Sequence, residues 1–337
     1  MDLRQSIFKP GNVQLPPLDD STDSNSAHLK PLPWSNYFED KQNVSVGDTH
    51  FNVYSSGMAN TSGPVFVFHH GAGHSGLTFG LVSQYIYNSD PSHITVVAPD
   101  FRGHGDTIGE NQDNLSLDRL VDDLAGIVDA MFPDNKRHIV LVGHSMGGAV
   151  VAHAAASKKI RRVLGLALID IVEGSAMDSL SAIPAFINAR PQTFRSVESA
   201  IRWHIDAEHI QNRESARLSV PSLIKPISKE DDSKVWAWRT QLMPSQRFWR
   251  GWYSELSRTF VSAPTAKLLV LAGTDRLDKE LLIAQMQGKF QLELLPAAGH
   301  TIQEDLPQRV GDVVLSFWKR NQPLDISAIR RVNPVPS

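Results

Sequence analysis

The chain has 337 residues, a formal net charge of −3 and no cysteine. Its length fits one large α/β domain or two small ones, and the lack of cysteine excludes disulfides, thiolate metal sites and a cysteine nucleophile. No long basic run or membrane-length apolar run occurs, so we expect neither nucleic acid nor a membrane as partner. The N-terminus lacks the apolar core of a signal peptide, which predicts a cytoplasmic or nuclear protein.

Predicted elements follow one another in a regular order after a polar start. Residues 1–33, rich in Pro, Ser, Asp and Asn, predict a disordered leader before a domain over 34–320 and a C-terminal tail over 321–337. Short apolar runs predict strands near 42–46, 50–54, 64–68, 94–98, 139–142, 161–169, 267–271 and 290–295. Helical stretches are predicted near 77–87, 115–131 and 148–156. This alternation predicts an α/β fold with a mostly parallel central sheet flanked by helices.

One segment, 171–263, breaks the alternation because it contains no convincing strand. Its residue pattern is typical of helices, and it is rich in tryptophan. A polar stretch at 228–234 predicts an exposed loop. We therefore expect a helical insertion that forms a lid over the carboxyl ends of the sheet. Most of its tryptophans are expected only to pack the insertion onto the core.

A G-x-S-x-G motif at 143–147 places Ser145 between an apolar strand and a helix. Such a turn holds its serine in a strained conformation with the hydroxyl above the sheet, and the glycines permit the tight crossing. Ser145 is therefore the candidate nucleophile. The alternative is a serine in an ordinary glycine-rich turn, which the residues downstream disfavour.

A serine nucleophile needs a base that an acid orients. His300 follows the last predicted strand, on the edge of the sheet where Ser145 also lies, and is the candidate base. Two acids compete: Asp170 ends one strand and Asp275 follows the next. Hydrolases of this architecture more commonly use the later position, which favours Asp275, but periodicity does not decide between them.

Acyl transfer also needs hydrogen-bond donors for the developing oxyanion. The backbone N–H of Met146, at the start of a helix, is one candidate. The second is the N–H of Ala72, because the loop at 71–73 leaves the backbone open to approach.

Several histidines near this loop could suggest a metal site, namely His69, His70 and His74. No acidic partner stands at ligand spacing, so we predict no metal and no cofactor. His104, in a second glycine loop, is expected to be structural.

Together these features resemble the α/β-hydrolase superfamily. More specific runs are similar to the protein phosphatase methylesterase 1 family, at 34–38, 143–148, 169–178, 190–194, 274–279, 285–290 and 299–300. The resemblance covers roughly 33–320. It implies an α/β-hydrolase fold and a serine esterase that removes the methyl ester from the C-terminal leucine of the protein phosphatase 2A catalytic subunit.

The resemblance also implies that Asp170, rather than Asp275, is the acid of a triad with Ser145 and His300. Animal members carry a long acidic insertion where this chain has only a short polar stretch, so any role of that insertion is not transferred. Arg276 and Lys279 are candidate contacts for the substrate tail. Two other functions remain open: a general carboxylesterase for small esters, and a hydrolase-fold protein that binds a phosphatase without turnover.

Overall fold

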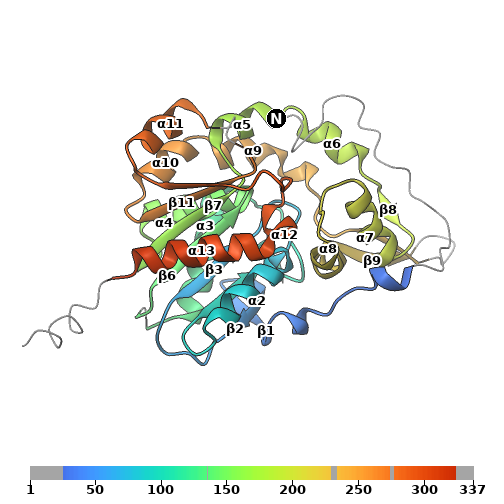
Figure 1. Cartoon of the computed structure of the whole chain (residues 1–337). Helices are drawn as coiled ribbons and strands as arrows, with labels where there is room; N and C mark the ends of the chain where they lie inside the picture. The colour runs from blue at the N-terminus through green and yellow to red at the C-terminus, as the bar shows by residue number, and fades with distance from the viewer. Residues whose placement is uncertain (1–25, 135, 229–233, 274–276, 324–337) are drawn as a thin grey trace, which may run out of the picture.

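A nine-stranded sheet forms the centre of the molecule in our computed structural model, which describes residues 26–134, 136–228, 234–273 and 277–323 (Figure 1). The strands are β1 (Asp40–Val46), β2 (Thr49–Ser56), β3 (Val65–His69), β4 (Thr95–Pro99), β5 (Ile108–Gly109), β6 (Ile139–His144), β7 (Val163–Ile169), β11 (Ala266–Leu271) and β12 (Gln291–Leu294). Their order is β1-β2-β4-β3-β6-β7-β11-β12, and β5 pairs with β2. All pairings from β4 to β12 are parallel, so the predicted parallel sheet is confirmed.

Helices cover both faces of this sheet. Alternate side chains of β3 enter two separate clusters: Val65 and Val67 lie in one, and Phe66 and Phe68 in the other. The first face carries α3 (Leu117–Met131), α4 (Met146–Ser157) and α10 (Leu256–Ser262). The second carries α2 (Gly80–Ser89) and α13 (Pro307–Asn321), which cross the front of the sheet in Figure 1. Short helices η3 (Gly76–Phe79), α11 (Lys279–Met286) and α12 (Ile302–Asp305) complete this body. None of the helices in the described ranges is both long and apolar enough to cross a membrane.

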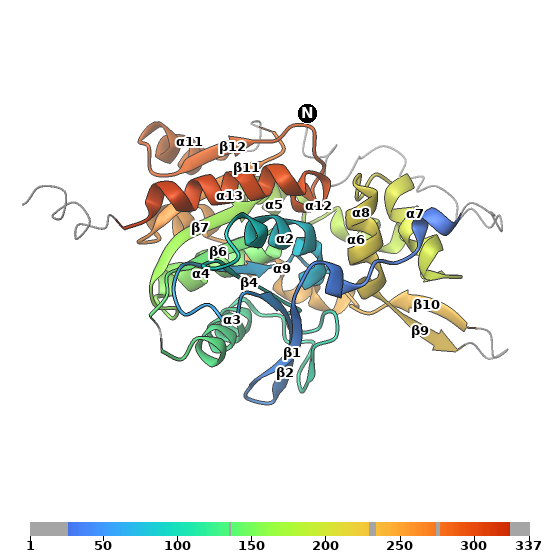
Figure 2. The same cartoon turned by 60° about the horizontal axis from the view of Figure 1, so that its bottom comes forward.

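The predicted insertion contains helices, but the expectation that it lacks strands is wrong. Its helices are α5 (Glu173–Ser179), α6 (Ile183–Ala189), α7 (Val197–Asp206), α8 (Arg213–Ser219), η4 (Val220–Leu223), η5 (Met243–Ser245) and α9 (Gln246–Tyr253). Between them β8 (Thr193–Phe194), β10 (Lys234–Trp238) and β9 (Ile224–Ser228) form an antiparallel sheet. Figure 2 shows β9 and β10 projecting beside the main sheet. These strands are short and β9 contains a proline, so they carry little local signal. Of the predicted exposed loop, 229–233 lies outside the described residues.

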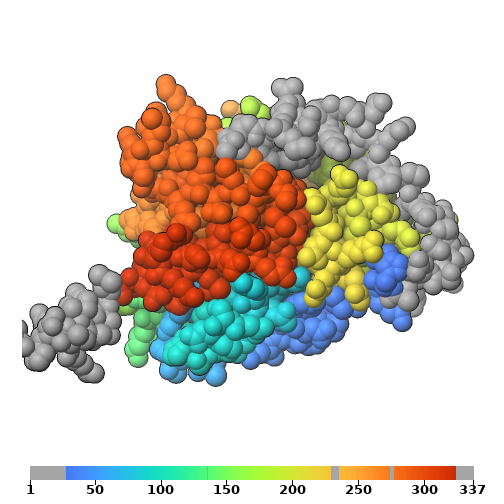
Figure 3. Space-filling view, viewed as in Figure 1, coloured from blue at the N-terminus to red at the C-terminus, as the bar shows by residue number. Residues whose placement is uncertain are grey.

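The chain is ordered earlier than the predicted boundary at residue 33. A short helix, η1 (Ser26–Leu29), precedes η2 (Trp34–Asn36). Leu29 is buried in the core of the insertion, and Arg217 on α8 donates from Nε to the Lys30 carbonyl at 2.7 Å. In Figure 3 this blue segment lies against the yellow residues of the insertion. Residues 1–25 of the predicted leader and 324–337 of the predicted tail lie outside the described residues.

Candidate active site

Ser145 lies at the sharp turn between β6 and α4, with φ 51° and ψ −121°. A side chain at either flanking glycine would collide with the backbone. A Cβ added to Gly143 would lie 2.3 Å from the carbonyl oxygen of Gly147. A Cβ added to Gly147 would lie 2.2 Å from the carbonyl oxygen of His69. The glycines of the motif are therefore required by the close crossing of strand and helix, as the sequence predicted.

His300 and Asp170 come together at the carboxyl edge of the sheet. The His300 Nδ1–H donates to Asp170 Oδ2 at 2.8 Å, and the Asp170 side chain is fully buried. The Ala272 amide donates to the other carboxylate oxygen, Oδ1, at 3.2 Å. Asp170 itself has a positive φ of 50°, a second strained position at a strand end. Both oxygens of the carboxylate are thus engaged, and the imidazole ring is oriented by one of them.

The structure does not test the alternative acid or the candidate substrate contacts. Asp275 and Arg276 lie outside the described residues. Lys279 is exposed at the start of α11 and is absent from the lining of the cavity described below, so its role in substrate binding stays a prediction.

Of the two candidate oxyanion donors, Ala72 precedes Ser145 in the sequence and Met146 directly follows it, and both lie close to Ser145 in space. Ala72 and Ser145 line the same cavity, and Met146 follows Ser145 as the first residue of α4. Within the described ranges, neither amide takes part in a turn, loop or side-chain hydrogen bond. The loop that carries Ala72 is held by His104, whose Nε2 accepts from the Gly73 amide at 2.9 Å. His104 is therefore a positioning residue.

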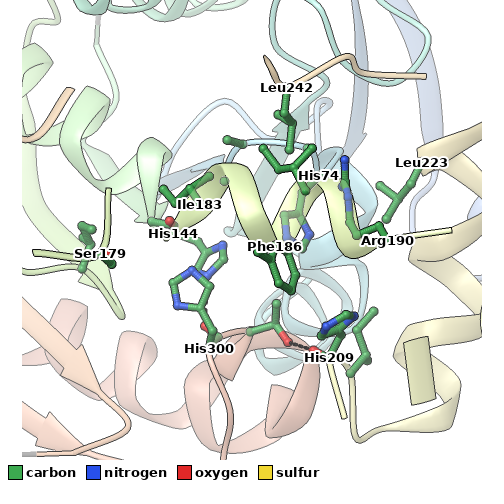
Figure 4. Close-up of a pocket in the computed structure, with 18 of the residues that line it drawn as sticks. His74, His144, Ser179, Ile183, Phe186, Arg190, His209, Leu223, Leu242 and His300 are labelled. Carbon is green, nitrogen blue, oxygen red and sulfur yellow. Dashed lines mark hydrogen bonds between the residues drawn. The ribbon is translucent and has the colours of Figure 1, made fainter. Parts of the chain in front are cut away.

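A cavity of about 220 Å³ opens at Ser145 and His300 and extends beneath the insertion. Aromatic and aliphatic side chains from the insertion form much of its wall, as Figure 4 shows for Phe186, Ile183 and Leu242. The insertion therefore supplies part of the cavity wall, and its role as a lid stays a prediction.

Two neighbours of the site had no signal in the sequence. Tyr253 on α9 lines the cavity, and burial raises the pKa of its hydroxyl to about 12, with the nearby Ser145 hydroxyl acting in the opposite direction. His144 donates from Nε2 to the His300 carbonyl at 3.0 Å and so holds the base's backbone. No hydrogen bond joins the Ser145 hydroxyl to the His300 ring, although both residues are described.

His69, at the end of β3, and His70 are buried, His74 in the following loop is partly exposed, and all three are uncharged. Burial lowers the pKa of His69 to about 3 and that of His74 to about 3. His70 donates from Nδ1 to the Gly71 carbonyl and accepts from the Phe101 amide at Nε2, so both ring nitrogens serve the loop. No group of three potential metal ligands occurs among the described residues.

One buried acid stands beside this loop. The carboxyl oxygen Oε2 of Glu304 on α12 lies 3.7 Å from Nδ1 of the uncharged His74 ring. Burial raises the pKa of Glu304 to about 8, so at neutral pH the carboxyl is largely protonated.

Hydrogen bonds connect the lid to the segment that carries His300. Thr301 donates from its hydroxyl to the His209 carbonyl at 2.8 Å, the dashed line in Figure 4. Asp305 accepts from the Gln211 amide at one oxygen and from the Gly299 amide at the other. The position of the candidate base is therefore fixed partly by the lid.

Comparisons with known proteins agree with this architecture. The chain matches the Alpha/beta hydrolase family over residues 66–313. The solved structure of E-2-(acetamidomethylene)succinate hydrolase aligns with a TM-score of 0.66 at 23% identity, covering 83% of this chain and 99% of that one, which shows the fold alone.

Curated relatives are more similar. "Protein phosphatase methylesterase 1" of Bos taurus is 39% identical over 336 residues, with 87% of each chain covered. The protein of the same name from Schizosaccharomyces pombe is 40% identical over 297 residues, with 86% of each chain covered. The Aspergillus oryzae protein is 42% identical over 318 residues, covering 89% of this chain and 74% of that one. On this similarity, spread over most of both chains, the protein belongs to the protein phosphatase methylesterase 1 family of alpha/beta hydrolases.

Proposed function

We propose that this chain is a serine carboxyl methylesterase that removes the methyl ester from the C-terminal leucine of the protein phosphatase 2A catalytic subunit, which is its partner. The substrate is supported by the name and the 39% identity of the bovine relative. The chemistry rests on one observation: a buried Asp170 carboxylate holds His300 at 2.8 Å on the cavity that Ser145 also lines.

In the proposed reaction the Ser145 Oγ attacks the ester carbonyl carbon, and His300 Nε2 takes the hydroxyl proton. Asp170 keeps the proton of the neutral ring on Nδ1, leaving Nε2 free to accept, and stabilises the imidazolium that forms. His300 then returns its proton to the departing methoxide, which leaves as methanol. A water molecule, activated by the same ring, releases the free carboxylate and restores Ser145. The hydrogen bond between Ser145 and His300 forms with substrate in place, as catalytic hydrogen bonds often tighten only in the complex.

The Ala72 and Met146 amides are proposed to stabilise the oxyanion. Their N–H groups are not engaged in the loop and side-chain hydrogen bonds of the described residues. The N-terminus of α4 adds its dipole at the same point. Donors fixed in place before the reaction need no reorganisation when charge develops.

The cavity suits the end of a chain rather than the middle of one. Ser145 lines it together with residues of the insertion, so a chain end that entered would bring its terminal ester to the nucleophile. Apolar side chains such as Ile183 and Phe186 would surround an aliphatic terminal side chain. This agrees with a leucine methyl ester.

Loss of the methyl ester from the purified, methylated phosphatase tests the proposal, with mass spectrometry of its C-terminal peptide as the readout. Ser145→Ala should lower the rate about 10⁶-fold, whereas Ser92→Ala, at an exposed serine, should retain it. Full activity of Ser145→Ala would exclude the mechanism.

A general carboxylesterase is the second candidate, because an apolar cavity also accepts small apolar esters. It would hydrolyse p-nitrophenyl acetate and leave the methylated phosphatase intact. A protein that only binds the phosphatase would hydrolyse neither.

A further inference from the structure

Arg190 contributes a cationic side chain to the active-site cavity. It follows α6 as its C-terminal capping residue, with its amide donating to the Ile187 carbonyl. Arg190 lines the cavity together with Ser145 and His300. In Figure 4 the arginine lies beside Leu223, across the cavity from His300. Its guanidinium is therefore placed in the space a substrate would enter, at a distance from the reacting atoms.

This guanidinium has no carboxylate partner among the described residues. Its Nε is buried and has no hydrogen-bond partner there. Glu208 is an acidic residue on the same cavity wall, and no ion pair joins it to Arg190. Burial lowers the pKa of Arg190 to about 10, so the side chain still carries its charge at neutral pH. A partly buried cation without an ion-pair partner is unfavourable unless something else compensates it.

An aromatic ring supplies part of that compensation and fixes the arginine in place. The guanidinium carbon lies 4.3 Å from the centroid of the Trp238 ring, a cation–π geometry. Trp238 is itself held, since its Nε1–H donates to the Pro191 carbonyl at 2.8 Å and its ring packs at 5.4 Å from that of Phe194. The N–H groups at the edge of the guanidinium, which the stacking on Trp238 does not use, remain available to donate to another group.

The histidines around Arg190 add no charge to this end of the cavity. His74, His204 and His209 lie near Arg190, and burial together with its positive charge lowers the pKa of all three rings. They are uncharged at neutral pH. Arg190 therefore supplies this end of the cavity with a positive charge that no carboxylate of the described residues pairs with, which favours an anionic ligand.

We propose that Arg190 binds a side-chain carboxylate of the peptide substrate, one to a few residues before the ester-bearing terminal residue. The proposal rests on the proposed function, in which a peptide end enters the cavity. An extended peptide advances about 3.3–3.6 Å per residue, so residues upstream of the terminal one reach the far side of the cavity from Ser145. A planar guanidinium recognises a carboxylate through two parallel N–H···O hydrogen bonds. The site would then select methyl-esterified chain ends with an acidic residue near the terminus.

The test compares peptides that differ in one charge. C-terminally amidated hexapeptides ending in leucine, with Asp or Asn at one of the three positions before it, compete with hydrolysis of p-nitrophenyl acetate by the full-length enzyme. In the wild type the Asp peptide should inhibit about tenfold to a hundredfold more strongly than the Asn peptide at one position at least. Arg190→Gln should remove that ratio and Arg190→Lys should restore part of it. Arg309→Gln, at an exposed arginine on α13, is the matched control and should keep the full ratio.

Each outcome has a defined meaning. A wild-type ratio near one, or a ratio that Arg190→Gln leaves unchanged, overturns the proposal, because a purely structural arginine would weaken both peptides equally. A second pair of peptides has no acidic side chain, and one of them ends in a free carboxylate and the other in an amide. This pair tests whether Arg190 instead binds the terminal carboxylate of the product. If Arg190→Gln abolishes discrimination only in that pair, the arginine binds the product terminus and the proposal is wrong. Turnover of the matching peptide methyl esters is measured separately, so its failure would count against the proposed function while the inhibition ratios still decide the role of Arg190.

Discussion

Replacing Asp170 by asparagine should abolish most of the activity without removing any heavy-atom contact. In the wild type one carboxylate oxygen accepts from the Ala272 amide and the other from His300 Nδ1–H. An asparagine must keep its carbonyl oxygen towards Ala272, since that amide needs an acceptor, and so turns its NH₂ group towards His300. The ring nitrogen facing it must then accept, which moves the ring proton to Nε2.

A histidine with its proton on Nε2 cannot take the proton of Ser145. We expect kcat to fall about 10⁴-fold, equivalent to about 5.4 kcal/mol of transition-state stabilisation. The change should appear in single-turnover hydrolysis of a peptide methyl ester, with circular dichroism and thermal unfolding to show that the fold is intact. Asp275→Asn serves as the control and should lose much less.

The reasoning would be refuted if Asp170→Asn kept more than about a tenth of the wild-type kcat, a loss far smaller than a wrong tautomer causes. If Asp275→Asn were instead the inactive variant, the acid of the triad would be the residue after β11.

Two further predictions concern stability. Glu304 loses its proton near pH 4.5 when the chain is unfolded and only at about pH 8 when it is folded, so wild-type stability should fall as the pH rises between those values. The Tm of Glu304→Gln relative to that of the wild type should therefore rise over the same interval. A difference in Tm that does not depend on pH would contradict the raised pKa of Glu304. Gly147→Ala should lower stability by about 1–3 kcal/mol because its Cβ would meet the His69 carbonyl oxygen. Gly251→Ala, in α9 with nothing within 4 Å of the new atom, should raise it by about 0.5–1 kcal/mol, as calorimetry would show; equal effects at both glycines would refute the packing argument.

The central sheet was predictable because its strands are continuous apolar runs separated by helical spacing. The same physics identified Ser145 and His300, since both follow predicted strands at one edge of the sheet. It did not separate Asp170 from Asp275, because in the sequence Asp170 directly follows one strand, β7, and Asp275 follows its parallel neighbour, β11. The family resemblance favoured Asp170, and the structure brings that residue to His300.

The lid was less predictable because its structure depends on contacts distant in sequence. β8 has only two residues, and its pairing with β10 involves Phe194 opposite Trp236. Arg190 reaches the cavity from the end of α6 and Tyr253 from α9, and no local pattern predicts that either side chain lines the cavity. The sequence shows which residue types are present, whereas only packing shows that Arg190 is partly buried with no carboxylate partner among the described residues.

The part of the insertion around α7, α8 and its small sheet has a core separate from the two clusters of the main sheet, and Leu29 belongs to it. Regions with their own small core open at lower free energy than the main body. Amide hydrogen exchange in α7 and α8 should therefore be faster than in β6 and β7. Shortening the chain past Leu29 would accelerate exchange in the lid and leave the sheet protected. The turn at Ser26–Leu29 thus contributes to how long this part of the insertion stays folded, far from Ser145 in the sequence.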